Sequence, residues 1–200
     1  MVGGLQKKKV IKFNLKDKLF LLLRFVFILN ILSLPLYLIV YFNLTFTPFQ
    51  TLLASFISNL LRFSGYSVQQ SEHFIKILYS GGILHAEISW DSTGWKSLYL
   101  ITALTIATPF INFKNKLKFL SIGLPILFSI NIIRIFTTLL IALTYGIEYF
   151  DLIHTFLWRE GLIFAVLFLW LLWINHYLKI KKTKFIFREY ANRGKSGRFK

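Results

Sequence analysis

Four long apolar windows dominate this sequence and limit what it can fold into. They span residues 19–42, 98–113, 119–143 and 161–178. A helix needs ~20 predominantly apolar residues to cross the hydrocarbon core of a bilayer, and the first and third windows reach that length alone. The second and fourth reach it with the flanking residues 95–97 and 155–158. Hydrophobic side chains make up 56% of the chain, more than a soluble domain of this length carries. We therefore predict an all-α integral membrane protein with about four transmembrane helices.

The distribution of basic residues predicts how these helices are oriented. Six of the 24 Lys and Arg residues lie in 7–18, three in 114–118 and nine in 179–200. Six of the eight acidic residues lie instead in 43–96 and 144–160. Cytoplasmic loops of membrane proteins carry an excess of Lys and Arg. We therefore expect a cell-membrane protein with both termini in the cytoplasm and the two acidic segments outside.

Composition also excludes several function classes. The net charge of +16 is explained by this topology, together with attraction to anionic lipid, so we expect no nucleic-acid partner. The chain has no cysteine, which excludes disulfides, thiolate metal sites and a cysteine nucleophile in this chain. We expect no metal ion and no cofactor.

The chain divides at the ends of its apolar windows. We predict a basic cytoplasmic tail at 1–18, a single membrane domain at 19–178 and a second basic cytoplasmic tail at 179–200. Residues 43–93 form an extracytoplasmic insert in the membrane domain. No repeat or Pro/Gly-rich linker divides the chain further.

The insert begins with a segment of helical periodicity at 47–63. Its apolar positions are Leu52, Phe56, Leu60 and Phe63, opposite Gln50, Ser58 and Arg62. This pattern predicts an amphipathic helix lying at the membrane interface. The alternative, a fifth span, would move the basic 113–118 loop and one polybasic tail outside, and we disfavour it for that reason.

A small extracytoplasmic β-hairpin is predicted in the second half of the insert. Residues 73–78 and 83–90 flank Ser80-Gly81-Gly82, and glycine supplies the positive φ that a tight hairpin turn requires. The second arm alternates apolar and polar residues and leads directly to Asp91.

Three polar clusters stand at the edges of, or inside, the apolar windows. The first is the run Trp-Asp-Ser-Thr-Gly-Trp-Lys-Ser at 90–97, the second is Asn131 with Arg134, and the third contains Asp151, His154 and Arg159. An ionisable side chain in a membrane segment is costly unless it is paired or hydrated. The clusters meet successive membrane edges, so we predict that they form one composite site.

Each cluster also has a structural interpretation. Residues 91–93 are good N-cap residues for the helix that follows. Arg134 lies roughly 13 Å from the outer end of its window. It either reaches the interface in part by snorkelling or pairs with Asp91, Glu148 or Asp151. The alternative to a site role for His154 is that of an ordinary histidine at the membrane interface. Because His154 and Arg159 are five residues apart, they point about 140° away from each other on a helix, and we expect only one of them to face the site.

In order and spacing, the clusters resemble the exosortase/archaeosortase family over residues 88–159. The segments that carry the resemblance are the 90–97 run, Asn131-Ile132-Ile133-Arg134, and His154 followed by Trp158-Arg159. That family consists of multi-pass membrane cysteine transpeptidases. They recognise secreted proteins by a C-terminal sorting signal made of a short motif, a transmembrane helix and a basic end. They cleave near the motif and pass the new C-terminus to a lipid or other acceptor.

The resemblance implies which residues form the site. The catalytic positions would be Ser92, Arg134, and His154 or Arg159. The substrate-binding positions would be Asp91, Thr93, Trp95 and Asn131. The family has Cys where this chain has Ser92. An inactivating Cys-to-Ser replacement, a natural serine enzyme and a non-catalytic relative would each explain that difference, and we favour the first.

The chemistry implied by the resemblance depends on a thiol at position 92. A nearby Arg134 would favour the thiolate and stabilise the oxyanion of the tetrahedral intermediate. His154 would protonate the leaving amine. The alternative of another class is a membrane protein that binds sorting-signal helices or a partner protein without cleaving them. We disfavour a transporter, because the polar residues gather at one face instead of lining a path across the membrane.

The orientation of the chain can be tested with single cysteines. We expect an impermeant thiol reagent to label the Gln70→Cys variant on intact cells and not the Asn115→Cys variant, since only the first position is predicted to lie outside. Permeabilised cells, in which both variants should react, provide the control. Labelling of Asn115→Cys but not Gln70→Cys on intact cells would reverse the orientation.

Overall fold

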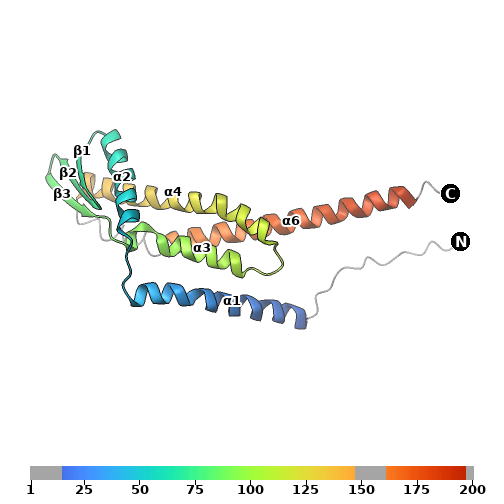
Figure 1. The fold of residues 1–200 in the computed structure, drawn as a ribbon. Helices are drawn as coiled ribbons and strands as arrows, with labels where there is room; N and C mark the ends of the chain where they lie inside the picture. The colour runs from blue at the N-terminus through green and yellow to red at the C-terminus, as the bar shows by residue number, and fades with distance from the viewer. Residues whose placement is uncertain (1–14, 147–160, 197–200) are drawn as a thin grey trace.

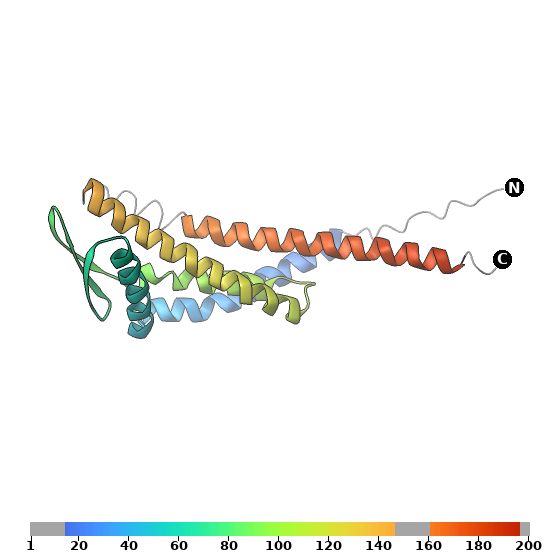
Figure 2. The same ribbon diagram turned by 90° about the horizontal axis from the view of Figure 1, so that it is seen from above.

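The computed structural model describes residues 15–146 and 161–196, with side chains described as far as residue 180. Four helices run alongside one another, and a fifth crosses one end of them next to a small sheet (Figure 1). The four are α1 (Leu15–Tyr41), α3 (Trp95–Ala107), α4 (Phe113–Tyr145) and α6 (Leu162–Ser196). The start of α1 and the end of α6 both lie at the end away from the sheet (Figures 1 and 2). Seen from above, α6 extends past the other helices at that end (Figure 2).

Three of these helices are long and apolar enough to cross a membrane, which agrees with an all-α membrane fold. They are α1, α4 and the Leu162–Ile180 part of α6. Helix α3 is apolar but has only 13 residues, shorter than the span predicted from the 98–113 window. It ends at Ala107 because Pro109 follows Thr108, and the residue before a proline is disfavoured in the α conformation. Thr108 accordingly has ψ of 116°.

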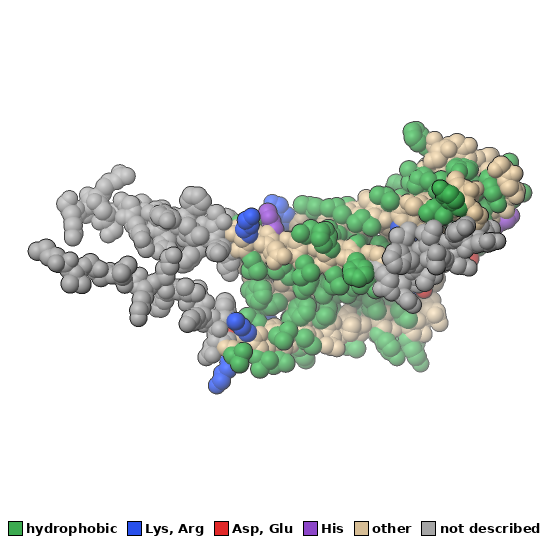
Figure 3. Space-filling model, turned by 180° about the vertical axis from the view of Figure 1, so that it is seen from behind, with side chains coloured by type: hydrophobic (Ala, Val, Ile, Leu, Met, Phe, Trp, Pro, Cys, Tyr) green, Lys and Arg blue, Asp and Glu red, His purple; other side chains and the backbone are tan. Residues whose placement is uncertain are grey.

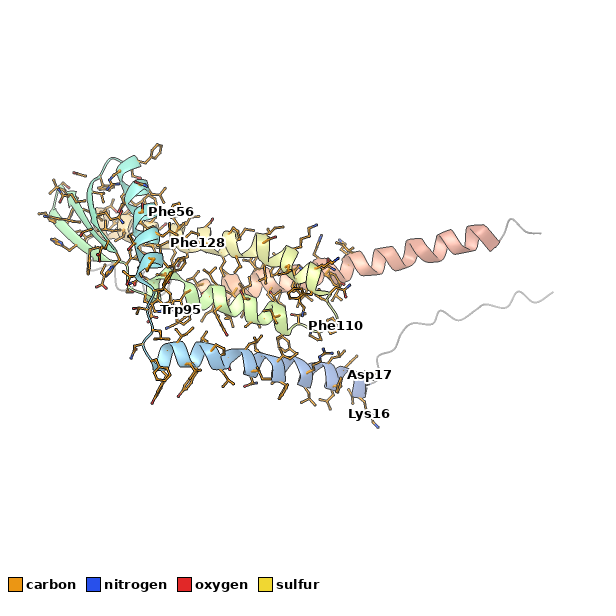
Figure 4. The ribbon with its side chains drawn as sticks, in the orientation of Figure 1. Lys16, Asp17, Phe56, Trp95, Phe110 and Phe128 are labelled. Carbon is orange, nitrogen blue, oxygen red and sulfur yellow. The ribbon has the colours of Figure 1, made fainter. Side chains whose placement is uncertain are left out.

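The surface of the bundle is consistent with lipid contact. Hydrophobic side chains cover the middle of the helices, while Lys and Arg appear at the end away from the sheet (Figure 3). Lys16 lies at that end, at the start of α1 (Figure 4). The basic 114–118 segment, predicted as a loop, instead forms the first turns of α4. Helix α4 contains both this basic segment and the apolar window that follows it, so the lysines still lie at one end of a membrane-crossing helix.

The crossing helix, α2 (Thr47–Phe63), has the bounds predicted for the amphipathic helix. Its predicted apolar face is exposed, and Phe63 is 93% accessible, so this face is available to the membrane interface. The opposite face was predicted to be polar, yet Gln50 and Ser58 on it are buried with Leu53 and Ile57. Gln50 is buried because its Nε2 donates to the Ile88 carbonyl at 2.9 Å, which satisfies the amide away from water.

The sheet contains the predicted hairpin and one further strand. Strands β1 (Ser67–Ser71), β2 (Phe74–Tyr79) and β3 (Gly82–Glu87) pair antiparallel in that order. The β2–β3 hairpin closes at the Tyr79–Gly82 pair, where Gly82 has φ of 132°, a value that only glycine adopts readily. Strand β3 ends at Glu87, earlier than the predicted arm. Strand β1 was not predicted, since Ser-Val-Gln-Gln-Ser has a single apolar residue.

Two hydrophobic cores meet along α4. The first packs the inner faces of α2 and the sheet against the C-terminal half of α4, which contributes Ile135, Leu139 and Leu143. Phe128 of α4 joins it by an edge contact with Phe56 of α2, at 6.1 Å between ring centroids (Figure 4). The second core packs α3, α4 and α6 around Leu127 of α4. Residues 128–134 of α4 therefore lie where the two cores adjoin.

Candidate functional site

The segment that joins β3 to α3 forms one side of the site. Its first residue is Ile88, and both backbone groups of Ile88 are hydrogen-bonded. The N–H donates to the His73 carbonyl at 3.0 Å, and the carbonyl accepts from the Gln50 side chain. A short 3-10 turn, η1 (Asp91–Thr93), follows. Thr93 Oγ1 donates to the Trp90 carbonyl at 2.7 Å and closes the turn on itself. The 88–93 segment is thus held in place before α3 begins.

Gly94 permits α4 to approach this turn closely. It has φ of 76°, in the left-handed region, where side chains are disfavoured. A Cβ at this position would lie 2.8 Å from Cγ of Asn131. Only glycine therefore fits both the backbone conformation and the packing against α4.

Two side chains of α4 hydrogen-bond to the carbonyls of the turn. Asn131 Nδ2 donates to the Thr93 carbonyl at 2.8 Å and lies 3.3 Å from the Ser92 carbonyl. Arg134 Nη2 donates to the Ser92 carbonyl at 2.9 Å. Both side chains are nearly buried, with 2% and 7% of their surfaces exposed. Residues three apart share a helix face, so the spacing of Asn131 and Arg134 brings both to the same turn.

Part of the hydrogen-bonding capacity of these side chains is unused. Arg134 Nη1 and Asn131 Oδ1 are buried and have no hydrogen-bond partner within the described part of the chain. Asp91, one candidate acidic partner for Arg134, forms an ion pair with Lys96 at 2.8 Å. A buried cationic donor without a partner among the described residues is costly.

The hydroxyl of Ser92 is engaged locally. Ser92 is 7% exposed, and its Oγ donates to the Ser89 carbonyl at 2.8 Å. Ser89 Oγ lies 3.2 Å from Ser92 Oγ. Ser89 was not among the predicted site residues, although it lies three residues before Ser92, a spacing that brings side chains together within a helical turn.

A cavity of about 340 Å³ brings Ser92 and Arg134 to a common space. It extends between β3 and α4, and Thr138 and Leu139 line it one turn beyond Arg134. Its lining is largely apolar and also includes five polar residues: His85, Glu87, Ser92, Arg134 and Thr138. Such a lining is typical of ligand sites, which hold a few polar groups in a largely apolar pocket.

Not all of the predicted site residues reach this cavity. Asp91 and Trp95 line a separate cavity of about 270 Å³ beside the end of α1. There Trp95, at the start of α3 (Figure 4), stacks on Trp90 with ring centroids 5.2 Å apart. Thr93 and Asn131 are buried beneath Ser92 and support the turn. His154 and Arg159 lie outside the described residues.

These features define a multi-pass membrane protein with a largely apolar pocket, which holds Ser92 and Arg134, at the sheet end of its helices. The sequence profile of the transmembrane exosortases matches residues 10–174, and the chain therefore belongs to the transmembrane exosortase family. No curated protein and no solved structure matches the chain. Membership supports a membrane transpeptidase role in general and points to the cysteine transpeptidase class.

The close contact at Gly94 predicts a large effect of adding one methyl group. We expect Gly94→Ala to destabilise the protein by at least about 1–2 kcal/mol, the usual cost of a left-handed side chain, because Asn131 blocks the new Cβ as well. Thermal unfolding in detergent should show a lowered Tm. Gly123→Ala is the matched control on α4, since its Cβ meets a Phe119 ring carbon at 3.4 Å, an ordinary contact. Equal Tm values for both variants would contradict the close approach.

Proposed function

We propose that this protein is a membrane transpeptidase of the cysteine type, present here in an inactive Cys-to-Ser form. Its substrates are secreted proteins with a C-terminal sorting signal, which it cleaves before transferring the new C-terminus to a lipid or other acceptor. The observation that supports this proposal most directly is the cavity shared by Ser92 and Arg134, in a chain of the transmembrane exosortase family.

The position of Arg134 suits acyl transfer at residue 92. Its guanidinium donates to the Ser92 carbonyl at 2.9 Å, so the charge lies beside the residue that would carry the nucleophile. The second terminal nitrogen, Nη1, has no partner among the described residues. A preorganised donor in a water-poor pocket stabilises the negative charge that develops on a tetrahedral intermediate. We assign Arg134 to that role.

The proposed reaction has two acyl-transfer steps. A thiolate at position 92 attacks the scissile carbonyl, the C–N bond breaks, and the leaving amine takes a proton from His154. His154 then takes the proton of the acceptor nucleophile, which attacks the thioester and releases the thiolate. The guanidinium cannot act as the base, because it stays protonated. Serine breaks the first step, since a neighbouring cation does not bring an alcohol near ionisation.

We place this site at the extracytoplasmic face. The sheet lies at the end of the helices opposite the start of α1 and the end of α6 (Figure 1), and residues of β3 line the Ser92 cavity. The basic residues that favour the cytoplasm belong to those two helix ends and to the start of α4. A sorting signal whose basic end stays in the cytoplasm would present its motif at the sheet end.

Binding without cleavage is the second candidate function. It is favoured by the hydrogen bond from Ser92 Oγ to the Ser89 carbonyl, which occupies the hydroxyl proton within the turn. In that case the cavity holds the signal of a secreted protein, and the acceptor has no role.

Restoring the thiol distinguishes these functions. We expect Ser92→Cys to cleave a co-expressed secreted protein that carries a C-terminal sorting signal, and to accumulate a thioester-linked intermediate when acceptor is scarce. Immunoblotting of the substrate and mass spectrometry of the enzyme provide the readouts. Ser89→Cys is the matched control, because it places a thiol three residues away, at a position that does not line the Arg134 cavity. If Ser92→Cys cleaves no such substrate while the Ser92 chain still binds one, binding is the function.

The role of Arg134 is tested in the Ser92→Cys background. Arg134→Lys keeps the charge and loses the planar fork of donors, so we expect processing to fall by about 10²–10³-fold, the usual effect of losing one oxyanion donor. The protein should remain in the membrane at a normal level. Arg62→Lys provides the control, because Arg62 lies on α2 and bonds to Asn59 and Val68. Undiminished processing by Arg134→Lys would contradict the catalytic role.

A further inference from the structure

Strand β3 has a free edge on the side away from β2. The sheet order is β1-β2-β3, and no strand of the described chain pairs with the outer side of β3. The β2–β3 register pairs His85 with Lys76 and Ala86 with Ile75. Ladder residues alternate between hydrogen-bonded and non-hydrogen-bonded pairs, and Ile88 bonds to His73. Ala86 therefore bonds inward to β2, whereas the backbone groups of Ile83, His85 and Glu87 point to the free edge.

The Ser92 cavity runs along this edge. Five consecutive residues, 84–88, line it together with Ser92 and Arg134. Successive side chains of a strand point to opposite faces of the sheet, so a cavity lined by consecutive residues cannot lie on one face alone. It follows the edge of β3 and ends at the turn that carries Ser92.

The sequence of β3 lacks the strongest devices that prevent pairing along this edge, and its one charged residue, Glu87, lies 3.8 Å from His73 of the same sheet. Proteins protect free edges with proline, lysine, bulges or a covering element. Strand β3 reads Gly-Ile-Leu-His-Ala-Glu and contains neither proline nor lysine. The opposite edge differs, because the Val68 carbonyl of β1 accepts a hydrogen bond from Arg62 of α2. Among the described residues, the edge of the sheet without a hydrogen-bonding partner is thus the one beside Ser92 and Arg134.

We propose that the substrate's sorting motif binds as an added β-strand along the free edge of β3. This inference rests on the proposed function and names the conformation that the site recognises: an extended peptide, held through its backbone. Its N–H and C=O groups pair with those of Ile83, His85 and Glu87. Strand addition of this kind gives affinity through the backbone and specificity through alternate side chains. The strand continues into the 88–93 segment, so the peptide carbonyl beyond the paired stretch reaches residue 92 and the guanidinium.

The apolar inner face of the cavity sets the side-chain preference. Leu84 and Ala86 face the core with Ile135 and Leu139, so alternate peptide residues that point inward meet apolar walls. The residues between them point toward His85 and Glu87. The site therefore selects motifs with small or apolar residues at every second position.

Proline substitutions on the enzyme test the free edge. In the Ser92→Cys background, His85→Pro removes an N–H that points outward and leaves the β2–β3 ladder intact, which edge strands tolerate. We expect cleavage to fall by at least about tenfold, the effect of losing one backbone hydrogen bond, with a Tm close to that of the parent. Gln70→Pro, at an outward position of the opposite edge, should leave cleavage unchanged. Ala86→Pro should lower the Tm, because it removes a ladder bond to Ile75.

A proline scan of the co-expressed substrate provides the second readout. We expect cleavage, and co-purification with the Ser92 chain, to be lost at every second position of the motif, since only alternate peptide N–H groups face β3. Strand addition would be overturned if substrate cleavage were lost at every position of the scan or at none, and if the His85→Pro enzyme cleaved as well as its parent.

The two proposals fail in different ways. If Ser92→Cys cleaves substrate and His85→Pro cleaves it equally well, the edge is not the docking site and the transpeptidase function stands. If Ser92→Cys cleaves nothing while the Ser92 chain still captures substrate with period-two sensitivity to proline, the edge is the docking site and the function is binding. No capture and no cleavage would overturn both.

Discussion

The hydrogen bonds from Asn131 and Arg134 to the carbonyls of η1 hold the two parts of this protein together. Helix α4 contacts the sheet core with one half and the helix core with the other. Between the two, its amide and guanidinium donate to the Ser92 and Thr93 carbonyls. Buried carbonyls need such partners, and Gly94 allows the approach because it carries no Cβ. The position of residue 92 relative to the cavity follows from this contact.

In the proposed mechanism, Arg134 adds a chemical role to the structural one that its hydrogen bond to the Ser92 carbonyl gives it. Burying a guanidinium costs free energy that one hydrogen bond to a neutral carbonyl does not recover. A protein that required only a turn support at this place would do as well with a neutral donor such as Asn131. Within the described residues Nη1 has no partner, and the proposed mechanism gives it one in the charge that develops on the intermediate. On that mechanism a lysine should be a poor substitute, since it lacks the planar fork of donors.

The sheet is part of the site as well as a cover for the helix ends. Its inner face completes the core with α2, and its free edge forms a wall of the Ser92 cavity. The proposed substrate is anchored in the membrane by its own helix and must present its motif at the interface. An open strand edge would accept an extended motif without a deep cleft, because pairing uses backbone groups that every sequence provides. Ser92 Oγ donates a hydrogen bond to the Ser89 carbonyl. A thiol at position 92 would hold this local bond less strongly, since S–H is a weaker donor.

The amino-acid sequence by itself determined the membrane class, the bounds of α2, the β2–β3 hairpin and the pairing of the Asn131–Arg134 segment with the 90–97 run. These follow from local periodicity, from turn glycines and from the cost of burying polar groups in lipid. The tertiary structure decided what depends on long-range contacts. It shortened α3 at Pro109, added the polar strand β1, and turned Asp91 and Trp95 to a cavity other than that of Ser92. The sequence did not reveal that β3 borders the Ser92 cavity. Whether a strand lies at the edge of a sheet depends on which strands pair with it, and its distance from the cavity depends on tertiary packing.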